Sequence, residues 1–104
     1  MIEITFDPEK LDLRITGHAG SGESGKDLVC CAVSTLFYTL AECLTDCSEM
    51  LEEEMIYEYE EGNGHIQCTP KTRYLAIIQR TYYTVLTGLH MLAKAYPQYL
   101  LLIN

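Results

Sequence analysis

The chain has 104 residues, 48% of them hydrophobic, which suits a single domain, residues 1–104, with one core. Its formal net charge of −8 argues against direct binding to the phosphates of DNA or RNA and favours a basic partner. The N-terminus lacks the basic-then-apolar pattern of a secretory signal, and no apolar run approaches the roughly 20 residues of a membrane span. We therefore expect a cytoplasmic protein with no nucleic-acid partner and no membrane partner.

The first elements in the chain are two short strands. Residues 2–6 and 11–16 alternate apolar with polar side chains on either side of a turn at residues 7–10. A period of two is typical of strands that place one face on the core. The pattern predicts a β-hairpin.

A glycine-rich segment follows and leads into a helix that we predict from Asp27 to about Leu51. Asp27 is a good N-cap because its carboxylate can accept from the amide of Cys30, which places Cys30 in the first helical turn. The glycines let the backbone adopt conformations that other residues avoid. We interpret the segment as a mobile loop that brings His18 over Cys30; its glycines are Gly17, Gly20, Gly22 and Gly25.

The second half predicts two strands, a helix and a last strand. Alternation over residues 54–60, the Asn63-Gly64 turn signal and residues 65–68 indicate a second hairpin. Thr69-Pro70 reads as a helix start, and apolar residues then recur every three or four positions until Pro97. Residues 99–103 are apolar on both faces, which predicts a strand buried on both sides or covered by a partner subunit.

The resulting order, ββαββαβ, predicts an α+β fold with about five strands in one sheet and two amphipathic helices.

Cys30 is the strongest candidate for chemistry. The positive end of the helix dipole and unpaired amides favour a thiolate at a helix start, and a nearby histidine can protonate a leaving amine. His18 can reach the thiol if the loop folds back. The alternative is an inert cysteine buried in an apolar helix start. Cys31 points about 100° away on the helix and is predicted to lie in the core.

The other cysteines indicate neither a disulfide framework nor a metal site. The total of five is odd, and no export signal is present. Cys43 and Cys47 lie one helical turn apart, but no companion pair of ligands is evident, so core packing is the better interpretation. We expect no metal.

Residues 20–26 fit the G-x-x-x-x-G-K pattern of a phosphate loop, but the pattern fails at the next position. Asp27 stands where a Ser or Thr hydroxyl would bind Mg²⁺, and Glu23 adds a negative charge where phosphates would lie. The preceding strand is also an alternating hairpin strand. Nucleotide binding is therefore the weaker alternative.

Three remaining features have ordinary structural interpretations. His65 is predicted to be a surface or turn residue, and His90 a solvated or lightly packed one. The Glu-rich stretch 49–61 is typical of a solvated face, although it could also hold a basic peptide.

The residues around Cys30 form a recognisable pattern. Gly17-His18-Ala19, then Asp27-Leu28-Val29-Cys30, then Ala32-Val33-Ser34 resembles the signature of the Prp family of bacterial ribosomal-processing cysteine proteases. Where that family has a small residue such as alanine after the nucleophile, this chain has Cys31. The specific match covers residues 17–34, and length and element order are similar over the whole chain.

The resemblance implies a cytosolic cysteine endopeptidase of small α+β fold that acts as a homodimer without a cofactor. It implies a ribosomal protein substrate of the large subunit, whose N-terminal extension is removed. The catalytic pair would be Cys30 and His18, supported by Asp27 and Ser34. The motif glycines fall on Gly17 and Gly25, and Gly20 and Gly22 complete the loop over the substrate. The alternative function is a non-catalytic acidic module that binds a basic ribosomal protein.

Overall fold

The structure is a computed structural model that describes residues 1–17 and 24–103, with residues 24–27 described through their backbone. The elements in chain order are β1 (Ile2–Asp7), β2 (Asp12–Thr16), α1 (Ser24–Asp46), the 3₁₀ turn η1 (Ser48–Met50), β3 (Ile56–Glu60), β4 (Asn63–Gln67), the 3₁₀ turn η2 (Thr72–Tyr74), α2 (Leu75–Ala95) and β5 (Leu100–Ile103). The predicted α+β class and the ββαββαβ order are confirmed.

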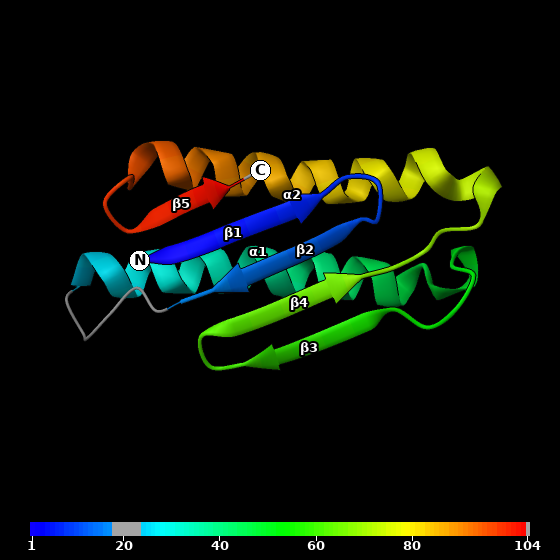
Figure 1. Ribbon diagram of the computed structural model, residues 1–104, viewed down its shortest axis with the longest axis horizontal. Coiled ribbons are helices and arrows are strands. Elements are labelled where there is room, and N and C mark those ends of the chain that lie inside the picture. The colour runs from blue at the N-terminus through cyan, green and yellow to red at the C-terminus, as the bar shows by residue number, and fades with distance from the viewer. Residues whose placement is uncertain (18–23, 104) are drawn as a thin grey trace.

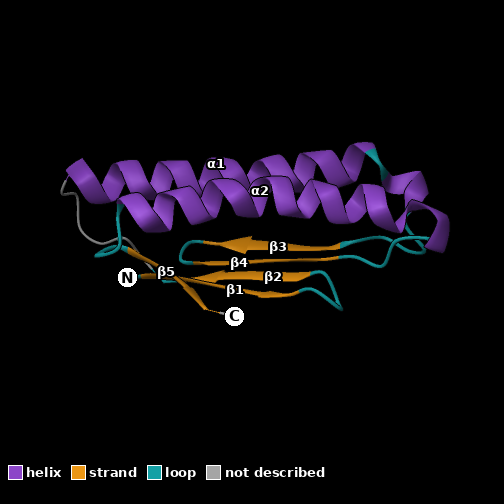
Figure 2. Ribbon diagram, turned by 90° about the horizontal axis from the view of Figure 1, so that it is seen from above, coloured by secondary structure: helices purple, strands orange, loops and turns teal. Residues whose placement is uncertain are grey.

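The molecule has two layers, a sheet and a pair of helices. The five strands form one sheet in the order β3-β4-β2-β1-β5 (Figure 1). The β1–β5 pair is parallel, and the other three pairs are antiparallel. Both helices lie on the same face of the sheet, and no other described element covers the opposite face (Figure 2). Strands β3 and β5 are therefore the two free edges.

The core fills the space between the two layers. The alternating apolar residues of β1 and β2 face the helices, and Ile4 and Leu13 are fully buried there. Phe37 of α1 and Tyr82 of α2 are the largest fully buried side chains. On β5 only one face is covered, since Leu101 is 46% exposed, so the expectation of a strand buried on both sides within one chain is wrong.

Helix α1 starts earlier and stops earlier than predicted. It begins at Ser24, so Asp27 lies inside the helical backbone and is not the N-cap. Cys30 is consequently the seventh residue of the helix, beyond its first turn. Serine and aspartate are both favoured at helix starts, and the apolar periodicity begins only at Leu28, so the sequence could not decide between them. The helix ends at Asp46, and η1 follows.

The second helix starts later than predicted because the backbone near Pro70 pairs with another segment. Pro70 forms an isolated bridge with Leu51, and the Lys71 N–H donates to the Met50 carbonyl oxygen (2.8 Å). Helix α2 starts only at Leu75. Its predicted end before Pro97 is confirmed.

The second hairpin turns two residues earlier than the Asn-Gly signal indicated. Glu60 pairs with Asn63, so Glu61 and Gly62 form the turn, and Gly62 has a positive φ of 80°. Gly64 is instead the second residue of β4. A Cβ atom there would lie 2.9 Å from the Phe37 ring, so the glycine lets the ring pack directly on the strand.

One segment of α1, Leu28–Asp46, is long and apolar enough to cross a membrane by length and composition, contrary to the sequence expectation. The core helix of a two-layer domain has the same composition. Here one side of the segment packs on the sheet through Val29, Val33 and Phe37.

Candidate active site

Cys30 lies on the side of α1 that faces the sheet. Its side chain is partly buried and packs against the core, whereas Cys31 is exposed. The prediction that Cys31 belongs to the core is therefore wrong. The helix turns about 100° per residue, and its buried stripe runs through Val29 and Val33, which leaves Cys31 on the outer side.

The direction of Cys30 follows from its spacing to Phe37. The two residues are seven positions apart, close to two full helical turns, so their side chains leave the helix in nearly the same direction. Phe37 packs on β4 at Gly64, and its ring centroid lies 6.0 Å from that of Tyr59 in β3. Cys30 thus projects two turns nearer the helix start, toward the tip of the β3–β4 hairpin. Ser34, partly buried, lies between them on the same side.

The hairpin tip is joined to the start of the glycine-rich segment. The Gly17 N–H donates to the Gly62 carbonyl oxygen (2.9 Å). Gly17 has φ of 99°, and a Cβ atom at this position would overlap the carbonyl oxygen of Met1, so only glycine fits without rearrangement. In both ribbon views the hairpin tip and the first turns of α1 lie toward the same end of the molecule (Figures 1 and 2). The residue after Gly17 is His18.

Part of the predicted site lies outside the described residues. This holds for His18, Gly20 and Gly22, so the Cys30–His18 pair stays a prediction. Gly25 and Asp27 are described only as backbone in the first turn of α1. The dipole effect falls off within the first turn of a helix. Since Cys30 lies in the second turn, the helix dipole favours a thiolate there less than the sequence suggested.

The described residues offer little support for metal or nucleotide chemistry. Within residues 1–17 and 24–103 no group of three or more His, Cys, Asp or Glu side chains is placed to hold a metal ion. All five cysteines are free thiols, and Cys43 is exposed, which corrects the prediction that it packs in the core. Strand β2, which precedes the glycine-rich segment, is antiparallel to both neighbours, unlike the parallel strand before a phosphate loop.

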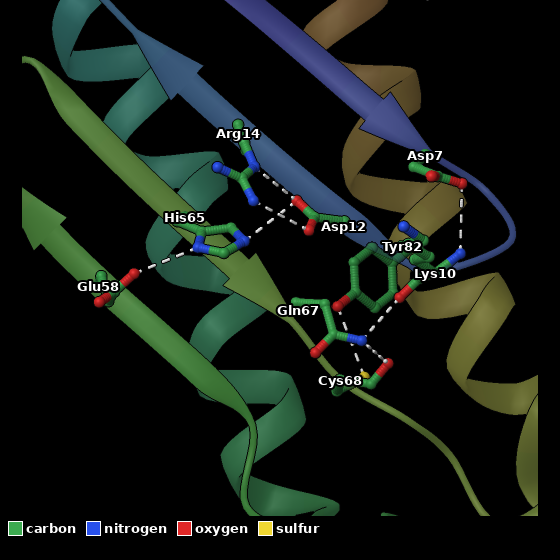
Figure 3. A network of polar contacts seen from close by, with 9 residues as sticks. All are labelled: Asp7, Lys10, Asp12, Arg14, Glu58, His65, Gln67, Cys68 and Tyr82. Atoms are coloured by element: carbon green, nitrogen blue, oxygen red, sulfur yellow. Dashed lines mark hydrogen bonds and ion pairs between the residues drawn. The ribbon is translucent and has the colours of Figure 1, made fainter.

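A polar network on the open face of the sheet is a feature that the sequence did not reveal (Figure 3). His65 lies in the middle of β4, not in a turn. Its Nδ1 lies 3.2 Å from Oε1 of Glu58 in β3, and its Nε2 lies 3.1 Å from Oδ1 of Asp12 in β2. Arg14 donates from Nε to the same Asp12 carboxylate at 3.1 Å. The network links three adjacent strands on the face opposite Cys30.

This network makes stability depend on pH. Partial burial alone would raise the pKa of the Asp12 carboxyl, but the hydrogen bonds from Arg14 and His65 outweigh this effect and hold the pKa below its ordinary value. A carboxyl whose pKa is lower in the folded state stabilises the fold above the unfolded-state pKa. That contribution is lost as the pH falls through the folded-state pKa.

We therefore expect Asp12→Asn to lower the midpoint temperature of thermal unfolding at pH 7. Between about pH 5 and pH 3 this midpoint should decrease less in the variant than in the unmodified protein. Thermal unfolding followed by circular dichroism across this range measures the effect. Glu9→Gln, in the exposed β1–β2 turn, is the matched control. An unchanged pH profile for Asp12→Asn would show that the network contributes nothing to acid stability.

The fold and the sequence are similar to those of known proteins. A family model described as cysteine protease Prp matches residues 1–101. SMU.848 from Streptococcus mutans is 26% identical, with a TM-score of 0.70 over 97% of this chain and 89% of that one. The essential ribosomal processing protease Prp from S. aureus, solved with a covalently linked product peptide, is 25% identical, with a TM-score of 0.72 over 97% and 94%.

The same S. aureus protease solved with a substrate peptide aligns with a TM-score of 0.71 at 24% identity, over 98% of this chain and 95% of that one. No curated protein matches the sequence. The family match spans nearly the whole described sheet and both helices, and includes the positions of Cys30 and Gly17. The chain therefore belongs to the Prp family of cysteine proteases.

Proposed function

We propose that this protease is a ribosomal processing endopeptidase with Cys30 as nucleophile and His18 as general acid and base. The observation that carries the proposal is the family match over residues 1–101, which includes both side chains. The position of Cys30 supports it, because the thiol projects toward the hairpin tip where the segment that carries His18 begins.

In the proposed mechanism the Cys30 thiolate attacks the carbonyl carbon of the scissile peptide bond and forms a tetrahedral oxyanion. The C–N bond then breaks as His18 gives a proton to the leaving amine. The remaining thioester is hydrolysed by a water molecule that His18 deprotonates, which releases the carboxylic acid and restores the thiolate. Backbone amides at the start of α1 would stabilise the oxyanion, with Asp27 and Ser34 in supporting positions.

The proposed substrate is a large-subunit ribosomal protein with an N-terminal extension, cleaved in the cytoplasm. Ribosomal proteins are basic because they bind RNA, and the net charge of −8 is complementary to such a substrate. A homodimer is part of the proposal. The apolar residues left exposed on the open face of β5, Leu101 at 46% and Ile103 at 38%, support a partner subunit there.

The test is mass spectrometry of the ribosomal protein precursor co-expressed with and without this protease. We expect removal of a short N-terminal segment only when the protease is present. The alternative, an acidic binding module that does not cleave, predicts a stable complex with the full-length precursor. An unshortened precursor bound to the protease would support that alternative and end the proposal.

A further inference from the structure

Strand β3 leaves one row of backbone hydrogen-bonding groups without a partner strand. Among the strands of the described residues it lies at the edge of the sheet and pairs only with β4 (Figure 1). All five of its residues are exposed. Free edges are where extended peptides can add to a sheet by main-chain hydrogen bonds.

The register identifies which groups face outward. Just beyond the end of β2, the Gly17 N–H donates to the Gly62 carbonyl oxygen. The backbone N–H and C=O groups of the odd-numbered residues of β2 therefore point toward β4. Because neighbouring residues alternate in an antiparallel ladder, Glu58 and Glu60 then exchange hydrogen bonds with β4. The N–H and C=O groups of Tyr57 and Tyr59 are left for an incoming strand.

Tyrosine rings line the helix side of this edge. Tyr57 and Tyr59 both pack against Phe37 with ring centroids at 6.0 Å, and Tyr38 lies 5.1 Å from Tyr59. A hydrogen bond with Tyr59 raises the pKa of Tyr38 to about 12. The three tyrosines remain 39–48% exposed, which leaves apolar ring faces beside the free backbone groups. Such faces attract the side chains of lysine and arginine.

The charge around the edge selects the kind of strand that can bind. Residues 28–70 contain nine acidic residues and no lysine or arginine. Near the start of β3 a cavity of about 700 Å³ is lined in part by Glu53, Glu54 and Tyr57. A second copy of β3 would place like charges opposite one another, which is destabilising. A segment with lysine or arginine at alternating positions would be complementary.

The edge also leads to the active site. Strand β3 runs toward the hairpin tip, and at this tip Gly62 is bonded to Gly17. The stripe of α1 that carries Cys30 and Ser34 continues to Tyr38, four residues further on, beside Tyr59. A chain lying along β3 therefore reaches the end of the molecule toward which Cys30 projects.

We propose that the β3 edge binds the basic segment that follows the scissile bond of the substrate, as an added antiparallel strand. The direction rests on the proposed function: when an N-terminal extension is cleaved at Cys30, the rest of the substrate leads away from the thiol. Strand β3 runs toward that end, so the substrate runs antiparallel to it. Tyr57 and Tyr59 pair with its backbone, and the surrounding glutamates contact its basic side chains.

Binding is tested first in the Cys30→Ala protein, which cannot cleave. The probe is a fluorescent synthetic peptide whose C-terminal half carries lysine at alternate positions, compared with the same peptide carrying glutamine there. Glu54→Lys with Glu60→Lys should weaken binding of the lysine peptide about tenfold at 150 mM salt and leave the glutamine peptide unchanged. The matched control, Glu3→Lys with Glu9→Lys, makes the same change in net charge elsewhere and should have less than a twofold effect.

A second variant tests the backbone pairing. Tyr59→Pro removes one outward N–H from an edge strand where proline is tolerated, and should weaken both peptides relative to Tyr59→Ala. In the active enzyme the Glu54/Glu60 changes should raise KM for the lysine peptide several-fold without changing kcat.

Equal effects of the two charge-reversed pairs would overturn the proposal, because they would indicate a non-specific charge effect. Cleavage that is insensitive to the Glu54/Glu60 changes would also overturn it and leave the proposed function intact. The expected binding pattern without any cleavage would lead to the opposite conclusion. It would support peptide binding at the β3 edge and contradict the proposed protease function.

Discussion

Replacing Cys30 with alanine is expected to abolish peptide cleavage, lowering kcat/KM by at least about a thousandfold. The change removes the only atom that forms the covalent bond in the proposed mechanism. Because Cys30 is partly buried and alanine is smaller, the fold should tolerate the substitution at a modest cost in stability. A peptide spanning the junction between extension and mature ribosomal protein, analysed by mass spectrometry, measures the loss.

Cys31→Ala is the matched control, because Cys31 is the adjacent thiol and is exposed on the outer side of α1. It should retain cleavage within about threefold of the unmodified protein, as expected for an exposed residue away from the site. Iodoacetamide provides a second measurement: inactivation should follow alkylation of Cys30 and not of Cys31. If the Cys31→Ala protein were inactive and the Cys30→Ala protein active, the nucleophile would be Cys31 and not Cys30.

The sheet and its helices could be predicted because their signals are local and repeated. Alternation over residues 2–6 and 11–16 defines the first hairpin, and the three-four spacing from Leu75 onward defines α2. The strand order could not be predicted in the same way. The parallel pairing of β1 with β5 joins the two ends of the chain, and no local pattern specifies it.

Two of the errors at element ends have the same physical cause: pairing with distant residues overrode a local preference. Pro70 is a favourable first residue of a helix, yet it bridges to Leu51. Asn63-Gly64 is a favourable turn, yet Gly64 is held in the strand beneath the Phe37 ring. Neither partner is near in sequence.

The candidate site residues were named from the sequence, and their catalytic roles stay predictions. The spacing of His18, Asp27 and Cys30 identified the family, and the structure places Cys30 at the sheet side of α1. The bond between Gly17 and the hairpin tip was not predictable, since it depends on β4 lying beside β2. The same strand pairing brings His65 between Asp12 and Glu58, a contact that sequence spacing does not reveal.

Gly17→Ala is expected to lower both stability and activity. The positive φ of 99° costs a residue with a Cβ atom about 1–2 kcal/mol, and overlap with the Met1 carbonyl adds to this, so we expect about 2–4 kcal/mol in total. Urea unfolding measures the loss of stability.

Gly62→Ala is the control that distinguishes the two effects expected of Gly17→Ala, which are backbone strain and displacement of the segment that follows Gly17. Gly62 also has a positive φ, 80°, and accepts the bond from Gly17 through its carbonyl oxygen, which alanine retains. We expect it to cost only about 1–2 kcal/mol and to leave kcat/KM nearly unchanged once the protein is fully folded. Gly17→Ala should instead lower kcat/KM more than tenfold under the same conditions, because displacement of Gly17 would move the start of the segment that carries His18, the proposed general acid and base. If both variants were equally active when folded, the anchoring of Gly17 at the hairpin tip would have no part in positioning the histidine, and its role would be in stability alone.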